Sequence, residues 1–396
     1  MSMQNTPASE RIHIGIFGKR NAGKSSLINA LTGQDLAIVS DVKGTTTDPV
    51  LKTMELLPLG PVVMIDTPGL DDTGVLGEER IKKTYQILNK TDIALLIVDA
   101  SEGFSSENQQ ILNRIKEKEI PYLVVYNKSD LLPEETPLPI ESSILVSARN
   151  QENIFQLKER IAALLPDENR DKPIVRDLIN ENDVVVLVVP IDSAAPKGRL
   201  ILPQQQTIRD LLEANALPII AKENTLRETL ASLQKDPALV ITDSQVFQTV
   251  NNILPSRIPL TSFSILFARY KGDLDALVEG ADALDSLKDG SHVLISEGCT
   301  HHRQCDDIGT VKLPRWLKEY TGASLQLSFT SGTEFPMDLS AYDLIIHCGG
   351  CMLNEREMKY RIRCAKDNHV PITNYGTAIA KIKGILAKSL KPFENQ

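Results

Sequence analysis

Cysteine is absent from the first 298 residues of this 396-residue chain, and only five cysteines follow. They are Cys299, Cys305, Cys348, Cys351 and Cys364. A secreted domain held by disulfides needs cysteines throughout its length, so this distribution excludes a disulfide framework for most of the chain. It indicates a reducing compartment, and we expect a cytoplasmic protein whose clustered thiolates bind a metal.

Long apolar runs and an excess of positive charge are also missing. No run approaches the roughly 18 uninterrupted apolar residues of a membrane helix, and residues 1–10 lack the basic-then-apolar pattern of an export signal. We therefore expect no membrane association. The net charge of -9 argues against nucleic acid as the main partner, because phosphate binding requires a surplus of Lys and Arg.

A complete phosphate loop lies near the start of the chain. The apolar segment 11–17 is typical of a buried strand, and it leads through GKRNAGKS at 18–25 into a helical pattern. In such a loop backbone N–H groups surround phosphate oxygens, Lys24 neutralises the β- and γ-phosphates, and the Ser25 hydroxyl binds Mg²⁺. The expected nucleotide contacts of the loop are Asn21, Ala22, Gly23, Lys24, Ser25 and Ser26.

Two segments downstream carry the groups that GTP hydrolysis requires. Thr46, in the hydroxyl-rich segment 44–48, is the predicted second side chain on Mg²⁺. Asp66 and Gly69 belong to a DTPG sequence after an apolar strand, where the carboxylate holds a water of the metal and the Gly69 N–H contacts the γ-phosphate. We therefore predict that Lys24, Thr46, Asp66 and Gly69 support hydrolysis.

Two further segments predict selectivity for guanine. Asn127, Lys128 and Asp130 follow a third apolar strand. The Asp130 carboxylate can accept hydrogen bonds from guanine N1–H and N2–H₂, which adenine cannot supply, while Asn127 fixes the loop. Ser147 and Ala148 follow the next strand and are expected to back the base.

These five segments, in this order, resemble the TRAFAC GTPases, and within them the group typified by the tRNA-modification GTPase and the ribosome-assembly GTPase Era. Leu70 stands where Ras-like enzymes place the glutamine that orients water, so hydrolysis needs other help. Asn21 stands where potassium-activated members have an asparagine, and the resemblance implies that K⁺ stimulates hydrolysis. In the alternative, Leu70 only packs and Asn21 only shapes the loop.

A second constellation predicts a metal site near the other end of the chain. Cys299 and His301 form one short cluster, and His347, Cys348 and Cys351 form another. Five donors overfill a tetrahedral zinc site and underfill the four-cysteine pattern of an ordinary ferredoxin. Three thiolates alone would leave one iron of a cubane cluster open, which suits a carrier or a catalyst. Zinc and an iron-sulfur cluster both remain open on these residues.

Strand and helix patterns alternate along the whole chain, which predicts an α/β protein. Among them, the segments 217–221 and 292–296 are predicted strands, and 207–214 and 355–367 are predicted helices. We predict an N-terminal P-loop GTPase domain over 1–166, followed by two smaller α/β domains with parallel sheets over 172–265 and 266–396. The middle domain shows no phosphate loop or titratable cluster. In the last domain both metal-binding clusters follow apolar strands, so they are expected at the same edge of a parallel sheet.

A GTPase of this group joined to Cys-x-His and His-Cys-x-x-Cys resembles the [FeFe]-hydrogenase maturation GTPases. The resemblance implies a scaffold on which Cys299, Cys348 and Cys351 bind a [4Fe-4S] cluster, with His301 and His347 as further ligands or supporting groups. It also implies that a diiron subcluster precursor is completed there and handed to the apo-[FeFe]-hydrogenase. The resemblance further implies that two radical S-adenosylmethionine maturases act upstream, that the middle domain forms a homodimer and that the last domain supports a tetramer.

One other class fits the same residues. An Era-like switch GTPase with a structural zinc domain, acting in RNA or ribosome-related assembly, would use the same Cys and His donors. Such a protein would carry a basic RNA-binding appendage. The acidic balance of the chain and its grouped cysteines favour the maturation GTPase.

Overall fold

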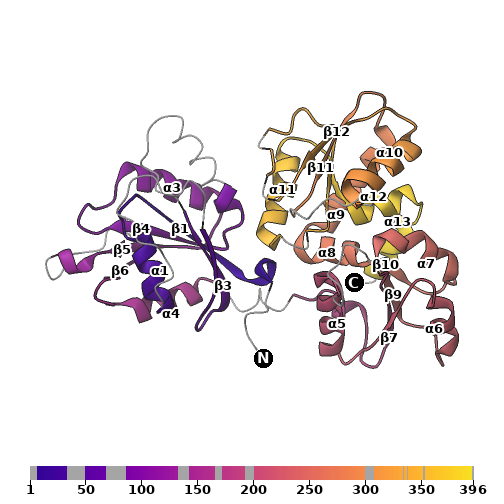
Figure 1. The fold of residues 1–396 in the computed structure, drawn as a ribbon, viewed down its shortest axis with the longest axis horizontal. Coiled ribbons are helices and arrows are strands. Elements are labelled where there is room, and N and C mark those ends of the chain that lie inside the picture. The colour runs from indigo at the N-terminus through magenta and orange to yellow at the C-terminus, as the bar shows by residue number, and fades with distance from the viewer. Residues whose placement is uncertain are drawn as a thin grey trace. The chain divides into compact units, whose positions relative to one another are not determined.

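A computed structural model describes most of the chain in two compact units, 1–171 and 172–396 (Figure 1). The described residues are 7–33, 50–67, 86–132, 142–165, 172–191, 200–298, 307–332, 334–336, 338–350 and 353–394. Within these ranges no helix is long and apolar enough to cross a membrane.

The first unit is built on a six-stranded sheet with the order β2-β3-β1-β4-β5-β6. All neighbouring pairs are parallel except β2 and β3, which are antiparallel. The strands are β1 (Ile12–Gly18), β2 (Val50–Leu56), β3 (Gly60–Asp66), β4 (Ile93–Asp99), β5 (Tyr122–Asn127) and β6 (Ser143–Leu145). Its central strands are apolar along most of their length, because helices cover both faces of the sheet.

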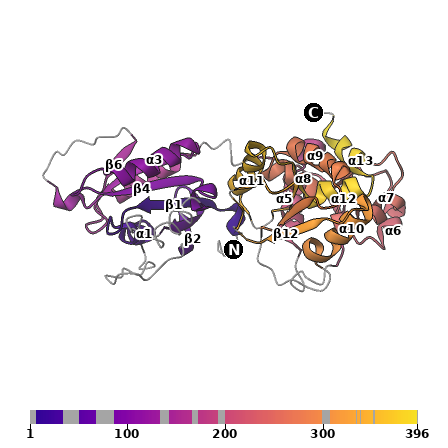
Figure 2. The ribbon, with the colours of Figure 1, turned by 90° about the horizontal axis from the view of Figure 1, so that it is seen from above.

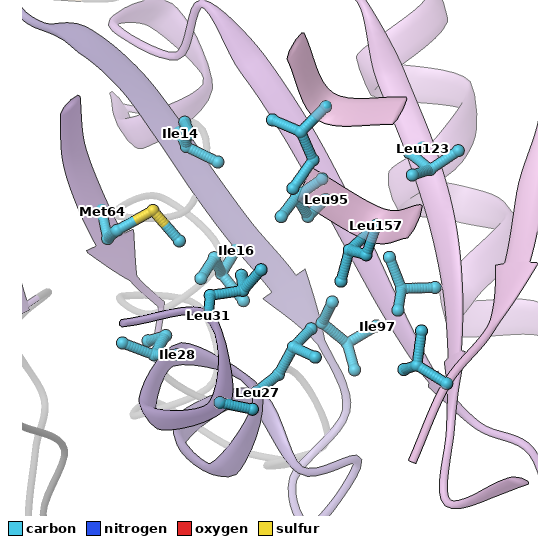
Figure 3. Packing of buried hydrophobic residues seen from close by; sticks show 14 of the residues in the cluster. Ile14, Ile16, Leu27, Ile28, Leu31, Met64, Leu95, Ile97, Leu123 and Leu157 are labelled. Atoms are coloured by element: carbon cyan, nitrogen blue, oxygen red, sulfur yellow. The ribbon is translucent and has the colours of Figure 1, made fainter. Parts of the chain in front are cut away.

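Alternate side chains of these strands enter two separate cores. Ile14 and Ile16 of β1 pack with α1 (Lys24–Thr32) and α4 (Ile154–Ala163), as Figure 3 shows for the α1 side. Phe17, on the opposite face of the strand, packs with α3 (Ser106–Glu117). Figures 1 and 2 accordingly show α1 and α3 on opposite sides of the sheet. The parallel strands end at one edge, where the phosphate and base loops follow.

The second unit contains two four-stranded parallel sheets. The first has the order β10-β9-β7-β8, and its strands are β7 (Val184–Val188), β8 (Leu217–Ala221), β9 (Leu239–Thr242) and β10 (Leu260–Ser262). Its helices are α5 (Leu202–Glu213), α6 (Leu226–Ser232), α7 (Phe247–Ile253) and α8 (Phe263–Lys271). Helices α5 and α8 cover one face, and α6 and α7 cover the other.

The second sheet of this unit has the order β12-β11-β13-β14. Its strands are β11 (His292–Ser296), β12 (Gln326–Thr330), β13 (Leu344–His347) and β14 (Ile372–Asn374). The helices are α9 (Leu274–Asp282), α10 (Leu313–Thr321), α11 (Glu355–Asp367), α12 (Tyr375–Ile382) and α13 (Leu386–Leu390). Helices α9 and α11 pack on one face, and α10 and α12 on the other.

The predicted fold class is confirmed: an N-terminal P-loop domain is followed by two α/β parts with parallel sheets. The domain limits at 166, 172 and 265 stay predictions, and α13 packs into the core of the sheet that contains β7. One helix begins earlier than its sequence pattern indicated. We expected it to start at Thr207, whereas α5 starts at Leu202, where the Gln204 side chain accepts a hydrogen bond from the Ile201 N–H.

Candidate nucleotide and metal sites

The phosphate loop joins β1 to α1 in the way its sequence predicts. Asn21 and Gly23 have left-handed backbone conformations, with φ of 60° and 86°. The Lys24 ammonium is buried and donates hydrogen bonds to the carbonyl oxygens of Gly18 (2.9 Å) and Lys19 (2.7 Å). Its charge therefore lies inside the loop, where phosphate oxygens are expected.

The predicted magnesium-binding groups meet at the carboxyl ends of β1 and β3. The Ser25 hydroxyl donates a hydrogen bond to Asp66 Oδ2 over 3.1 Å. Burial raises the pKa of Asp66, against the opposing effects of Lys24 and Ser25. A hydroxyl and a carboxylate at this distance supply oxygen ligands of the kind Mg²⁺ prefers. The other predicted hydrolysis residues, Thr46 and Gly69, lie outside the described residues.

Asn127, at the end of β5, connects the phosphate loop with the base loop. Its side-chain amide donates a hydrogen bond to the Ala22 carbonyl oxygen (3.1 Å), and its Oδ1 accepts one from the Ala148 N–H (3.0 Å). A Cβ at Gly23 would lie 2.2 Å from Asn127 Nδ2, so the contact also requires glycine at position 23. The amide therefore fixes three predicted nucleotide-binding segments in one arrangement.

The predicted guanine-binding residues gather beside this amide. Asp130 Oδ1 accepts a hydrogen bond from the Ser147 hydroxyl over 2.6 Å. Lys128 forms an ion pair with Asp99, the buried last residue of β4. Burial opposes ionisation of Asp99, but the bonds from Lys128 and Ser101 outweigh it and lower the Asp99 pKa.

Asn21 and Ser26 are the other two predicted nucleotide contacts in and after the phosphate loop. Asn21 is exposed, and Ser26 is half-buried in the first turn of α1. The left-handed φ of Asn21 suits asparagine, one of the few residue types other than glycine that adopt this conformation readily.

Cys348 follows β13 at the carboxyl edge of the second parallel sheet of unit 172–396. Its sulfur accepts hydrogen bonds from the backbone N–H groups of Gly298 (3.0 Å) and Gly350 (3.4 Å). Gly298 directly precedes Cys299 in the chain, so the backbone of one predicted cluster contacts the sulfur of the other. Backbone N–H donors at a sulfur favour the thiolate form, which is the form that binds metals.

His347 directly precedes Cys348 and is buried as the last residue of β13. Its Nδ1 lies 2.6 Å from the Cys348 carbonyl oxygen, and its Nε2 lies 2.9 Å from Nη1 of Arg361 on α11. Burial, followed by the charge of Arg361, lowers the pKa of His347 to about 3. The ring is therefore neutral at physiological pH, with both nitrogen atoms in hydrogen bonds.

Cys348 packs against the core cluster that contains Tyr375. The Tyr375 hydroxyl donates a hydrogen bond to Glu297 Oε1 over 3.1 Å. Burial, and then the negative charges of Cys348 and Glu297, raise the pKa of Tyr375 far above its usual range. Tyr375 therefore stays protonated and can keep donating to Glu297.

The remaining predicted ligands Cys299, His301 and Cys351 lie outside the described residues. Among the residues described, no group of three or more His, Cys, Asp or Glu side chains gathers around a possible ion. Cys348 is the one predicted cluster thiolate in the described part of the chain, and its sulfur accepts the two backbone hydrogen bonds given above. Gly350, two residues after Cys348, has a φ of 64°, and a Cβ there would meet Met358 Sδ at 2.5 Å, so this position favours glycine.

Comparison with known families supports the order of these parts. Residues 174–272 match the family model of the hydrogen maturase F dimerization domain, and residues 275–392 match that of its tetramerization domain. Together these matches span more than half of the chain. The chain belongs to the hydrogen maturase F family. The family that the motifs indicated is thereby confirmed, and this hydrogen maturase F chain carries domains for oligomerisation.

The nucleotide part of this hydrogen maturase F chain is a GTPase domain. Residues 13–128 match the family model of the 50S ribosome-binding GTPase. The tRNA modification GTPase MnmE of Chromobacterium violaceum is 37% identical over 169 residues, which cover 42% of this chain and 37% of that protein. GTPase Der of Wolinella succinogenes is 35% identical over 189 residues, covering 44% of this chain and 40% of that protein.

The chain thus spans about two fifths of the length of these curated relatives. Among solved structures, Aquifex aeolicus Era bound to GDP and AlF₄⁻ is 24% identical with a TM-score of 0.36, and the match covers 53% of this chain and 92% of that chain.

Sequence reasoning missed several residues at both sites of this hydrogen maturase F chain. Asp99 could have been found, because it ends a buried strand next to the one that carries Asn127. Glu297 also follows a strand directly. Tyr375 likewise directly follows β14, whereas Arg361 gave no such signal, because it lies in the middle of the amphipathic helix α11.

Proposed function

We propose that this hydrogen maturase F chain is a GTP-hydrolysing scaffold for [FeFe]-hydrogenase maturation. It holds a [4Fe-4S] cluster and a diiron subcluster precursor, and it transfers the precursor to apo-[FeFe]-hydrogenase. Family membership supports a role in hydrogenase maturation. The described residues of the two sites support the assignment of GTP hydrolysis to the first unit and of cluster binding to the second.

The observation that carries the proposal is the position of Cys348. Its sulfur lies at the carboxyl edge of a parallel sheet, and it accepts hydrogen bonds from the backbone of Gly298 and Gly350. Open α/β sheets bind ligands at this edge. Cys299 and Cys351 are the other proposed thiolates, and His301 is a further donor nearby in sequence. A cluster held by three thiolates supplies an open iron to which cargo can bind.

The GTPase domain acts as a switch in this proposal. Lys24 and the N–H groups of residues 21–26 bind the phosphates, and Ser25 with Asp66 holds Mg²⁺. Thr46 and Gly69 sense the γ-phosphate, and Asn21 holds K⁺ beside it. Loss of the γ-phosphate relaxes the segments around Thr46 and Asp66 and changes partner engagement, without taking part in metal chemistry.

The proposed partners are apo-[FeFe]-hydrogenase and two radical S-adenosylmethionine maturases that build the precursor. The middle part of the chain forms the homodimer, and the last part extends it to a tetramer.

Hydrogenase activation tests this function. The chain is purified from cells that also express both radical maturases, and it is then mixed with apo-hydrogenase while hydrogen evolution is measured. Cys348→Ala is expected to abolish activation. Cys364→Ala is the matched control, because Cys364 lies on α11 and packs with the core instead of the metal site. Full activation by Cys348→Ala would contradict the proposal.

A further inference from the structure

Arg361 is a buried charge that contacts His347, the residue before the proposed ligand Cys348. It lies on α11 with 0% of its surface exposed. Its guanidinium donates hydrogen bonds to Glu357 Oε1 (2.9 Å), Ser296 Oγ (3.1 Å) and the Gly332 carbonyl oxygen (2.8 Å), and it contacts His347 Nε2 (2.9 Å). A buried charge with this many partners is held in one position.

One nitrogen of Arg361 connects the two halves of the site. Nη1 is the atom that contacts both Ser296 and His347. These residues are paired neighbours at the carboxyl ends of β11 and β13. The chain continues from Ser296 to Cys299 and from His347 to Cys348, so both ligand-bearing segments leave the sheet next to this guanidinium.

The contact with Arg361 decides which nitrogen of His347 carries the proton. Arginine has donors only, so Nε2 must accept. The proton of the neutral ring then lies on Nδ1, which donates to the Cys348 carbonyl oxygen over 2.6 Å. The imidazole therefore forms a bridge from Arg361 to the backbone of Cys348.

We propose that Arg361 is a positioning residue of the cluster site, and that it makes His347 a support for the Cys348 loop instead of a ligand of the metal. This inference rests on the proposed function, since it concerns the cluster that the scaffold holds. Nε2 of His347 accepts a hydrogen bond from the guanidinium, and Nδ1 donates one to the backbone of Cys348. Both ring nitrogens are therefore engaged, and the thiolates hold the cluster without His347.

The metal-free protein provides the first test. The chain has six histidines, so selective ¹⁵N-histidine labelling gives few NMR signals, and His347→Gln identifies the one of interest. We expect His347 in a single tautomer with the proton on Nδ1, and a mixture of tautomers in Arg361→Met. A wild-type proton on Nε2 would overturn the inference. The wild-type spectrum decides this even if Arg361→Met does not fold.

The reconstituted protein provides the second test. We expect Arg361→Met to release iron to a chelator at least about tenfold faster than wild type, which is the usual size of an effect on groups that orient ligands. Arg361→Lys, which keeps the charge but loses the planar fork, should lie between the two. Arg363→Met is the matched control, because Arg363 lies on the same helix and is exposed. An unchanged release rate in Arg361→Met would refute the positioning role.

Pulsed EPR of the reduced, ¹⁵N-histidine-labelled protein adds a direct measure of iron ligation. We expect the spectra of wild type and His347→Gln to be alike, because His347 does not bind iron in wild type. In Arg361→Met, Nε2 of His347 is released, and we expect a strong nitrogen coupling from it. A strong coupling from His347 in wild type would contradict the inference. If wild type binds no cluster at all, the proposed function fails, while the tautomer measurement still decides the role of Arg361.

Discussion

The side-chain amide of Asn127 donates a hydrogen bond to the carbonyl oxygen of Ala22 over 3.1 Å. Because the same side chain accepts from the Ala148 N–H, the segments predicted to contact the phosphates and the base share one buried group. Nucleotide affinity should therefore depend on Asn127 although the side chain lies between the two binding loops.

Asn127→Ala is expected to weaken GDP and a non-hydrolysable GTP analogue alike, by roughly tenfold or more. The reason is that the buried partners at Ala22 and Ala148 lose their hydrogen bonds, which costs about 1–3 kcal/mol for each unsatisfied group. Isothermal titration calorimetry measures both affinities. Asn150→Ala, which removes an exposed side chain that donates a hydrogen bond to Glu152, should bind like wild type. An equal loss in both variants would contradict the connecting role.

Asp130→Asn is expected to change the preferred base. A carboxylate accepts two hydrogen bonds from guanine, whereas an amide offers one donor and one acceptor, which matches the 2-oxo group and N1–H of xanthine. Hydrolysis of GTP and XTP gives kcat/KM for each, and we expect the GTP value to fall at least about tenfold while the XTP value rises. If the variant keeps its preference for GTP, Asp130 does not bind the base.

The sequence predicted those parts of the fold in which local pattern and environment agree. The strands at 217–221 and 292–296 and the helix at 355–367 have the expected limits. The Asn354 side chain caps that helix by accepting from the Glu357 N–H, a signal that neighbouring residues alone provide. The phosphate and base loops could be predicted for the same reason, because their spacing is local.

Helices buried on several sides could not be predicted this way. In α12, Tyr375, Thr377 and Ala378 are all buried, so no polar stripe marks the helical period. Arg361 was missed for the opposite reason. A charged residue in an amphipathic helix normally faces water, whereas its partners here come from segments distant in sequence, which only the fold brings together.

The pKa of His347 predicts a pH dependence of stability in the metal-free protein. In the unfolded chain the ring binds a proton below pH about 6.5, but in the folded protein its pKa is about 3. Between these values the unfolded state binds the extra proton, so stability should be full above about 6.5 and decrease as the pH falls towards 3. Urea unfolding followed by Trp316 fluorescence reports this unit, since Trp316 is the only tryptophan.

His347→Gln removes the titrating group and should flatten that pH profile over the same range. His369→Gln serves as the control, because His369 is exposed and should leave the profile as in wild type. If the wild-type and His347→Gln profiles have equal slopes, His347 is not held neutral by burial and Arg361.

Lys24→Ala should separate the two activities of the chain. The ammonium lies inside the phosphate loop of unit 1–171, whereas the proposed cluster ligand Cys348 belongs to unit 172–396. We expect GTP hydrolysis to fall to background while the iron bound per chain after reconstitution stays at the wild-type value. Phosphate release and iron analysis on the same preparation measure both. Loss of iron in Lys24→Ala would contradict the separation.

The central claim, a thiolate-held cluster, is tested most directly by anaerobic iron and sulfide reconstitution of wild type, Cys348→Ala and the control Cys364→Ala. Metal analysis, visible absorption and EPR follow on each. We predict about four irons and four sulfides per chain in wild type and in the control, and their loss in Cys348→Ala. About one zinc per chain and no cluster uptake by wild type would contradict the claim and leave a GTPase with a zinc-stabilised partner domain.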